Sequence, residues 1–176
     1  MKRQVAIVTG AGQGLGRSFA LDFAREGARV GVLDADVYGP SQPRMLGLAG
    51  AEPESLDGKH IEPLKAHGLE VMSVGFMVGE ATPLIWRGPM VTQAVTQITF
   101  ETRWGALDYL IADLPPGTGD TQLTLSQKVP LAGVVIVTTP QQVATSVARR
   151  GLEMFTKVGV AVLHCPTIKP LDEAAI

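Results

Sequence analysis

The sequence predicts an α/β domain in which helices cover both faces of a parallel β-sheet. Short apolar runs alternate along the chain with segments of helical periodicity, as in repeated strand–helix units. The runs are apolar almost throughout, which is typical of strands buried on both faces. Several of them end on a glycine or a carboxylate, at the edge of the sheet where such folds bind ligands.

The expected elements alternate in order along a single domain. Residues 37–65 are rich in proline, glycine and polar side chains and are expected to form a long loop with one short helix. We expect helices over about 19–27, 88–102, 123–129 and 143–157. We expect strands over Val5–Val8, Arg29–Leu33, Leu69–Met77, Leu107–Ile111, Gly133–Thr138 and Val158–Leu163.

Composition and charge exclude several classes of protein. The 176 residues are 45% hydrophobic and 18% charged, as in an ordinary globular domain. A net charge of -2 and an aromatic content of 5% argue against binding to nucleic acid or to an anionic membrane. The single cysteine, Cys165, cannot form an internal disulfide, and no run is long enough to be a signal peptide or a membrane span. We therefore expect a cytoplasmic protein.

The segment LDYLIADLPPGTGD, from Leu107 to Asp120, contains the most informative pattern. Its apolar strand leads into Asp113, and the loop of Gly117, Thr118 and Gly119 follows. Glycines let backbone N–H groups approach a phosphate closely. The segment predicts the magnesium and γ-phosphate side of a nucleotide site. The alternative is a surface acid that ends a core strand.

The first strand, loop, helix and second strand predict the other side of this site. The glycine-rich loop TGAGQGLGRS precedes a helix whose N-terminus attracts anions. Asp34 and Asp36 follow the second strand, and the alternative for this pair is a hydrophilic strand end. The residues of the loop expected to contact phosphate are Gly10, Gly12, Gly14, Gly16, Arg17 and Ser18.

Four stretches between about Val30 and Leu163 point to one family. They are VGVLDADVYGPSQPRMLG, PLIWRGPMV, WGALDYLIADLPPGTGDTQLTLSQ and VVIVTTPQQVATSVARRGLEMF. Together they resemble the Mrp/ApbC family of MinD-like P-loop ATPases, which act as iron–sulfur cluster carriers. The resemblance implies a three-layer P-loop NTPase-like fold, here truncated at the C-terminus. It also implies a site for ATP and Mg²⁺, a homodimer and iron–sulfur client proteins.

The resemblance assigns roles to individual residues. Asp113 matches the Walker B acid, which holds Mg²⁺ through water, as suits a cation that prefers hard oxygen ligands. Asp36 matches the switch-I aspartate that activates the attacking water and is also expected near Mg²⁺, together with Ser18. Asp34 would assist the metal side as part of the nucleotide site. Gly117 to Gly119 match the loop that senses the γ-phosphate.

The glycine-rich loop departs from this family. The family pattern GKGGVGKST has two lysines, whereas this chain has Ala11 and Arg17 at the corresponding places. Arginine is planar and forked, so it does not replace a compact lysine in a tight phosphate cradle. We expect ATP hydrolysis to be weak.

The same loop resembles the TGxxxGxG motif of short-chain dehydrogenases. That resemblance implies NAD(P) as an alternative cofactor, with Asp34 at the ribose. Tyr38 and Tyr109 are followed four residues later by Gln42 and Asp113, so the catalytic lysine of that family is missing. The first alternative is therefore an inactive NAD(P)-binding Rossmann-like protein, and the second is a non-catalytic dimerisation scaffold.

The single domain thus divides into three segments. Residues 1–30 form a glycine-loop opening of dehydrogenase type, residues 31–163 an Mrp-like body, and residues 164–176 a tail. Members of the Mrp/ApbC family continue with a CxxC pair that holds a cluster between two subunits. Because this chain has Cys165 alone, we expect no iron–sulfur cluster on this chain by itself.

Overall fold

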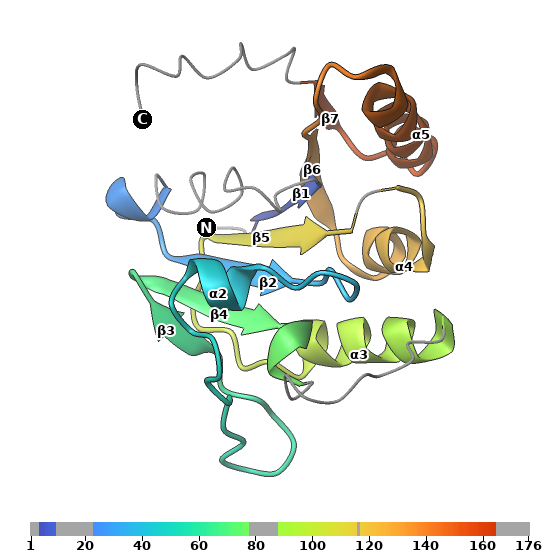
Figure 1. The fold of residues 1–176 in the computed structure, drawn as a ribbon. Coiled ribbons are helices and arrows are strands. Elements are labelled where there is room, and N and C mark those ends of the chain that lie inside the picture. The colour runs from blue at the N-terminus through green and yellow to red at the C-terminus, as the bar shows by residue number, and fades with distance from the viewer. Residues whose placement is uncertain (1–3, 10–22, 78–87, 116, 165–176) are drawn as a thin grey trace.

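The computed structural model describes residues 4–9, 23–77, 88–115 and 117–164. Within them the chain forms a sheet with helices packed against it (Figure 1). The predicted phosphate-binding residues between Gly10 and Ser18, and residues 165–176 of the tail with Cys165, lie outside the described residues.

The described strands form one seven-stranded sheet in the order β3-β4-β2-β5-β1-β6-β7. All neighbours pair in parallel except β3, which is antiparallel to β4. The strand order places β5 between β2 and β1. The strands are β1 (Gln4–Thr9), β2 (Val30–Asp34), β3 (Leu64–Ala66), β4 (Leu69–Ser73), β5 (Tyr109–Leu114), β6 (Leu131–Ile136) and β7 (Val162–His164).

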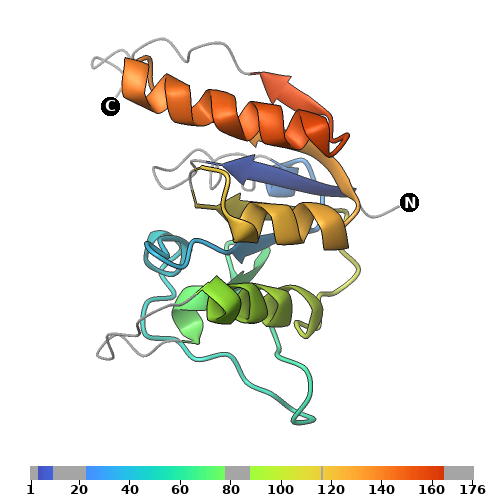
Figure 2. The same ribbon diagram turned by 90° about the vertical axis from the view of Figure 1, so that its right-hand side faces the viewer.

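Three of the described helices lie side by side over one face of the sheet (Figure 2). They are α3 (Gly88–Phe100), α4 (Asp120–Lys128) and α5 (Gln142–Lys157). The short helix α2 (Gln42–Met45) lies at the end of the sheet toward which β1 points, and the 3-10 helix η1 (Val74–Phe76) follows β4. None of the helices in the described ranges has the length and apolar character that a membrane crossing needs.

The sheet separates two hydrophobic cores. Along β2, Val30 and Val32 face one core and Leu33 faces the other, as the alternation of a strand requires. The core under α3, α4 and α5 contains Val95, Ile98, Leu125, Val134 and Phe155. The core on the opposite face contains Leu46, Leu69, Val71 and Ile111.

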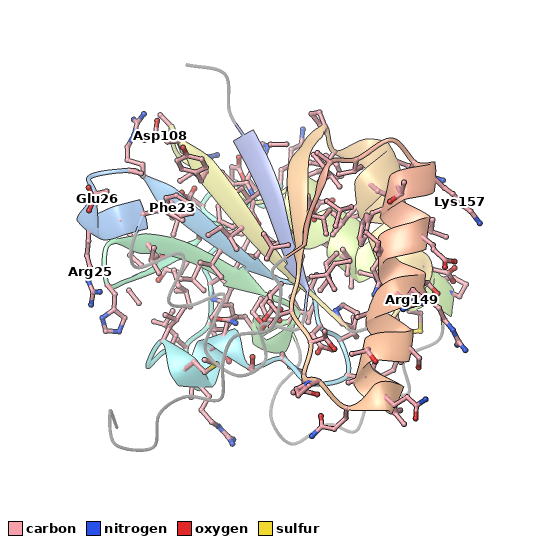
Figure 3. The ribbon with its side chains drawn as sticks, turned by 90° about the horizontal axis from the view of Figure 1, so that it is seen from above. Phe23, Arg25, Glu26, Asp108, Arg149 and Lys157 are labelled. Carbon is pink, nitrogen blue, oxygen red and sulfur yellow. The ribbon has the colours of Figure 1, made fainter. Side chains whose placement is uncertain are left out.

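Residues 23–26 lie on the opposite side of the sheet from α5 (Figure 3). The ring of Phe23 stacks on Tyr109 of β5 with a centroid distance of 4.8 Å. On the far side, α5 carries Arg149 and Lys157 on its exposed surface. The prediction of an α/β fold with helices on both faces is thus confirmed.

The sheet departs from the predicted parallel pairing at one edge, where β3 is antiparallel to β4. β3 occupies residues that the sequence assigned to the end of a long loop and the turn after it. The turn residues His67 and Gly68 have φ of 52° and 77°, the positive values that a tight two-residue hairpin needs. This hairpin reverses the chain and makes β3 antiparallel to β4.

Several boundaries also differ from those expected. β4 stops at Ser73, before η1, and does not continue to Met77. β5 begins at Tyr109 and continues through Asp113, which lies within the strand. β7 begins only at Val162, because Val158 and Gly159 still belong to the end of α5. The Gly159 N–H donates to the Thr156 carbonyl at 3.0 Å, and Gly159 has the positive φ of 77° that is typical of a helix end.

Candidate functional site

Polar side chains from three neighbouring strands meet near the carboxyl edge of the sheet. Asp34 of β2 pairs in register with Ser73 of β4 on one side and with Asp113 of β5 on the other. The exposed fractions of these residues are 0% for Asp34, 0% for Ser73 and 4% for Asp113. Two carboxyl groups are therefore buried side by side, where an uncompensated charge is unfavourable.

A set of hydrogen bonds holds the two carboxyl groups. Asp34 accepts from the Ser73 hydroxyl at 3.0 Å and from the backbone N–H of Gln42 at 3.1 Å, both on Oδ2. Its Oδ1 accepts from the backbone N–H of Asp36 at 3.2 Å. The side-chain amide of Gln42 donates through Nε2 to Oδ2 of Asp113 at 2.8 Å. Gln42, at the start of α2, therefore touches both acids.

Burial and charge together alter the acidity of Asp34. Burial, and after it the negative charge of Asp113, raise the pKa of Asp34 to about 7, against the opposing effect of the hydrogen bonds from Gln42, Ser73 and Asp36. A cation between the two carboxyl groups would favour their ionised forms. The described residues contain no cluster of three or more His, Cys, Asp and Glu side chains arranged for a metal. Two carboxylates suit Mg²⁺, which commonly takes one or two and fills its shell with water and phosphate oxygens.

Asp36 lies beyond the end of β2 and is half-buried. Its Oδ1 accepts from the backbone N–H of Tyr38 at 3.1 Å, a local loop contact. Ala35, which lies between Asp34 and Asp36 in the sequence, donates its backbone N–H to the carbonyl of Asp113 at 2.9 Å. The structure therefore brings Asp34 directly beside Asp113 and places Asp36 in the adjoining loop.

The loop after β5 leads into the N-terminus of α4. Gly117 has a φ of 107°, which favours glycine, and Gly119 is the N-cap residue of the helix. Thr118 and Gly119 are exposed, so this helix N-terminus is open to an anion. From within α4, the buried Gln122 donates through Nε2 to the Pro115 carbonyl at 2.6 Å and holds the start of the loop.

Sequence reasoning missed Gln42, Ser73 and Gln122. Ser73 had a recognisable signal, because it is a polar residue at the end of a mostly apolar strand. Gln42 gave none, since it lies in a polar loop whose return to the sheet cannot be seen in the sequence. Of the predicted residues, the glycines at 10, 12, 14 and 16, with Arg17 and Ser18, lie outside the described residues.

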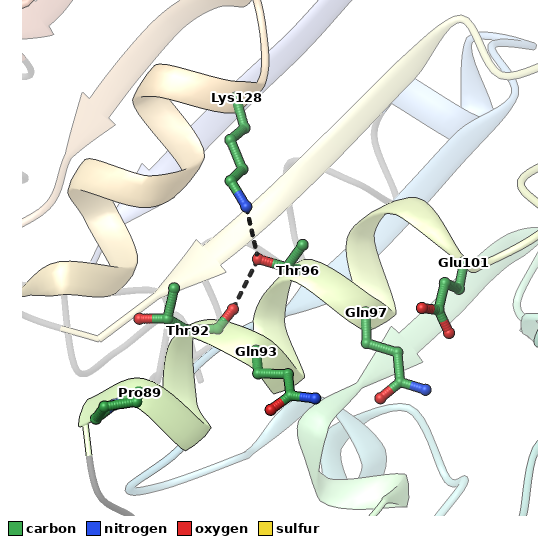
Figure 4. A pocket seen from close by; sticks show the side chains of 7 residues that line it. All are labelled: Pro89, Thr92, Gln93, Thr96, Gln97, Glu101 and Lys128. Atoms are coloured by element: carbon green, nitrogen blue, oxygen red, sulfur yellow. Dashed lines mark hydrogen bonds between the residues drawn. The ribbon is translucent and has the colours of Figure 1, made fainter.

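A pocket lies away from these carboxyl groups. It is a pocket of about 430 Å³ between α3 and α4 (Figure 4). Lys128 reaches across it and donates to the Thr96 hydroxyl at 3.4 Å, and that hydroxyl donates to the Thr92 carbonyl at 2.7 Å. The other lining residues are Pro89, Gln93, Gln97 and Glu101. Its lining contains none of the predicted site residues.

The sheet order and the acids at its carboxyl edge define an α/β protein of the P-loop NTPase class. A nucleotide-binding protein from Archaeoglobus fulgidus, solved in complex with ADP, has a TM-score of 0.73 and 31% identity, covering 96% of this chain and 70% of that one. The septum site-determining protein MinD from Pyrococcus horikoshii, solved with Mg-ADP, has a TM-score of 0.61 over 93% of this chain and 68% of its own. Its identity of 16% supports the fold alone.

The family follows from the sequence comparison. A model of the ParA family, described as NUBPL iron-transfer P-loop NTPase, matches residues 1–165, and the chain belongs to this family. The match includes the glycine-rich loop, and these comparisons do not support the dehydrogenase resemblance of residues 1–30.

Curated relatives carry names from iron–sulfur biology. An iron–sulfur cluster carrier protein of Pseudomonas fragi is 56% identical over 169 residues, which are 93% of this chain and 58% of that protein. The carrier protein of Escherichia coli is 49% identical over 93% of this chain and 45% of its own length. The iron–sulfur cluster transfer protein NUBPL of Mus musculus is 46% identical over 92% of this chain and 52% of its own.

The chain thus spans about half the length of these relatives. These relatives are named as carriers of iron–sulfur clusters, so the comparisons do not support the expectation that this chain alone holds no cluster.

Proposed function

We propose that this chain is the Mg-ATP-binding domain of a P-loop ATPase that acts in iron–sulfur cluster assembly or transfer. The observation that carries the proposal is the buried pair of Asp34 and Asp113 beside the Gly117–Gly119 loop. The family match and the ADP complex of the Archaeoglobus relative support the nucleotide. The names of the curated relatives support the link to iron–sulfur clusters.

Each residue of the site has a proposed task. Asp113 and Ser18 would hold Mg²⁺ through water, Asp34 lies beside Asp113, and the glycine-rich loop with Arg17 would contact the phosphates. Bound Mg²⁺ would neutralise charge on the β- and γ-phosphates. Asp36 orients the attacking water and takes its proton while the water oxygen bonds to the γ-phosphorus and the bond to ADP breaks. Gly117, Thr118 and Gly119 contact the γ-phosphate.

Hydrolysis is proposed to be weak. Arg17 and Ala11 stand where the family pattern has lysines, so the phosphates lack the compact positive charges of a complete cradle. The site would bind nucleotide mainly through backbone N–H groups and the metal. We therefore propose that this chain binds nucleotide but hydrolyses ATP slowly.

The assembly is proposed to be a homodimer in which the cluster is cargo for client proteins. Tyr38, Met90 and Val143 have exposed fractions of 77%, 44% and 78%. Tyr38 follows β2, while Met90 and Val143 lie in the first turns of α3 and α5. These apolar side chains belong to segments around the carboxyl edge of the sheet, where a second subunit can cover them.

A thermal-shift titration tests the proposed ligand. Mg-ADP and Mg-ATP are expected to raise the melting temperature, because a ligand at about 100 times its Kd adds about 2.7 kcal/mol to the stability of the folded state. NADP⁺ is expected to have no effect. Stabilisation by NADP⁺ or NADPH alone would favour the NAD(P)-binding alternative suggested by TGAGQGLG. No response to the adenine nucleotides or to NADP⁺ and NADPH would favour the alternative of a non-catalytic dimerisation scaffold.

A further inference from the structure

We propose that Gln42 is a positioning residue that holds Asp34 and Asp113 in place for a divalent cation. We further propose that its amide oxygen accepts a hydrogen bond from the water around that cation. The inference rests on the proposed function and adds to it a residue that does not belong to the predicted site. Gln42 is 1% exposed and touches both carboxyl groups.

The start of α2 explains how one residue reaches both acids. Gln42 is the first residue of the helix, and Pro43 follows it with its backbone fixed for a first turn. Ser41 makes no side-chain cap, so the N–H of Gln42 donates to Asp34 at 3.1 Å and Asp34 takes the part of the helix cap. The side chain then extends to Asp113 at 2.8 Å.

The chemistry of the amide suits a cation site. An amide donor orients a carboxylate without neutralising its charge, whereas a lysine or arginine at this place would compete with a metal. The Nε2 atom must face Asp113, because the opposite amide orientation would place two oxygen acceptors against each other. Gln42 therefore orients the Asp113 carboxylate without itself removing the negative charge of that group.

The amide oxygen of Gln42 is a buried acceptor that still needs a hydrogen-bond donor. Its Oε1 is buried and has no hydrogen-bond partner among the described residues. A buried acceptor without a donor is rare in folded proteins and usually has an unseen partner. Since the amide already contacts Asp113, water held by a cation at that carboxylate can supply the donor.

Binding of Mn²⁺, which shares the oxygen-ligand preference of Mg²⁺, tests this role. Mn²⁺ affinity is measured by electron paramagnetic resonance on the full chain with saturating ADP. The variant Gln42→Met keeps the length of the side chain but removes both polar atoms. We expect its Mn²⁺ affinity to fall about 10- to 100-fold, as is typical when a partner of a metal ligand is lost. Its affinity for ADP in EDTA should be unchanged.

A matched control separates positioning from a general loss of stability. Thr99→Val also removes a buried polar group, one that donates to the Val95 carbonyl within α3, away from both acids. This variant should keep wild-type Mn²⁺ affinity even where its melting temperature falls. If Gln42→Met does not fold, Gln42→Asn keeps the amide but is too short to reach Asp113, and it should show the same loss.

The outcomes distinguish this inference from the proposed function. A folded Gln42 variant with wild-type Mn²⁺ affinity would overturn the role of Gln42 and leave the proposed function intact. A wild-type chain that binds no Mn²⁺ in the presence of ADP would overturn the proposed function and this inference with it.

Discussion

At the scale of single residues, the site depends on Asp34, a carboxyl group buried beside another carboxyl group. The fold accepts this arrangement because Ser73, Gln42 and Asp36 donate hydrogen bonds to it. Burial and the neighbouring charge nevertheless favour its protonated form near neutral pH. A proton and a metal cation therefore compete for the carboxyl group of Asp34.

The stability of the metal-free protein is expected to depend on pH through Asp34. Its pKa is about 7 in the folded chain and about 3.9 when unfolded, so the folded state binds the proton more tightly. The free energy of unfolding should therefore fall as pH rises from about 4 to about 7, by on the order of 4 kcal/mol from this group, and then level off. Urea denaturation of the wild type and Asp34→Asn at pH 5 and pH 8 measures the effect. Equal pH dependence in the two proteins would contradict it.

Loss of Asp36 is expected to affect turnover and spare binding. Asp36→Ala removes the carboxylate proposed to accept the proton from the attacking water, while Asp34 and Asp113 remain in place. We expect phosphate release from Mg-ATP to drop at least about 100-fold, the usual contribution of a general base, and the Kd for Mg-ADP to change far less, since Asp113 still holds the metal side. Equal turnover in wild type and variant would remove Asp36 from the mechanism.

Part of this site could be predicted at the residue scale. Asp34, Asp36 and Asp113 follow or end apolar strands, and that pattern is visible in the sequence. The contacts of Ser73 and Gln42 could not be predicted from the sequence, because these contacts require β4, β2 and β5 to be neighbours in the sheet. Strand order is a property of the whole fold, and the local sequence does not determine it.

At the scale of elements, periodicity located the main helices and strands, and turn chemistry determined where they end. The missed strand β3 was indicated only by the His67-Gly68 pair, which forms the hairpin turn. β5 was expected to end at Ile111 but continues to Leu114, because Ala112 and Leu114 are buried in the core under α4. Apolar patterns therefore identified the elements but did not fix their boundaries.

Side chains from β5 and from the segment before it crowd position 31 of β2. A Cβ atom on Gly31 would lie 2.5 Å from Leu107 and 2.9 Å from Leu110, with Trp104 at 3.1 Å. We expect Gly31→Ala to destabilise the chain by about 1–3 kcal/mol through overpacking, measured by urea denaturation. Gly39→Ala, whose nearest atom would be 3.8 Å away, is the control and should change stability by less than about 0.5 kcal/mol. Similar effects at both positions would contradict this account.

At the scale of the whole molecule, the sheet gathers distant parts of the chain at one edge. Residues 34, 42, 73 and 113 meet only because the strands are ordered β4-β2-β5. The fold class was predictable from alternating apolar runs, and the family match agrees with it. The assembly proposed above would cover that edge.

Self-association is expected to involve the exposed apolar residues at this edge. Val143→Asp places a charge at a 78% exposed position at the start of α5 and should lower the dimer fraction at least about tenfold in the presence of Mg-ATP. Leu56→Asp changes a residue of similar exposure, 72%, in the loop before β3 and should leave the dimer intact. Sedimentation velocity measures both, and an unchanged dimer in Val143→Asp would place the interface elsewhere.

The central claim is that the carboxyl groups of Asp34 and Asp113 form the metal side of a nucleotide site. Calorimetric titration of ATP, with Mg²⁺ and with EDTA, into the wild type and Asp113→Asn tests it most directly. We expect tighter binding with Mg²⁺ in the wild type and loss of this Mg²⁺ dependence in Asp113→Asn, with the EDTA affinity unchanged. Equal dependence on Mg²⁺ in both proteins, or no binding of ATP to the wild type, would contradict it.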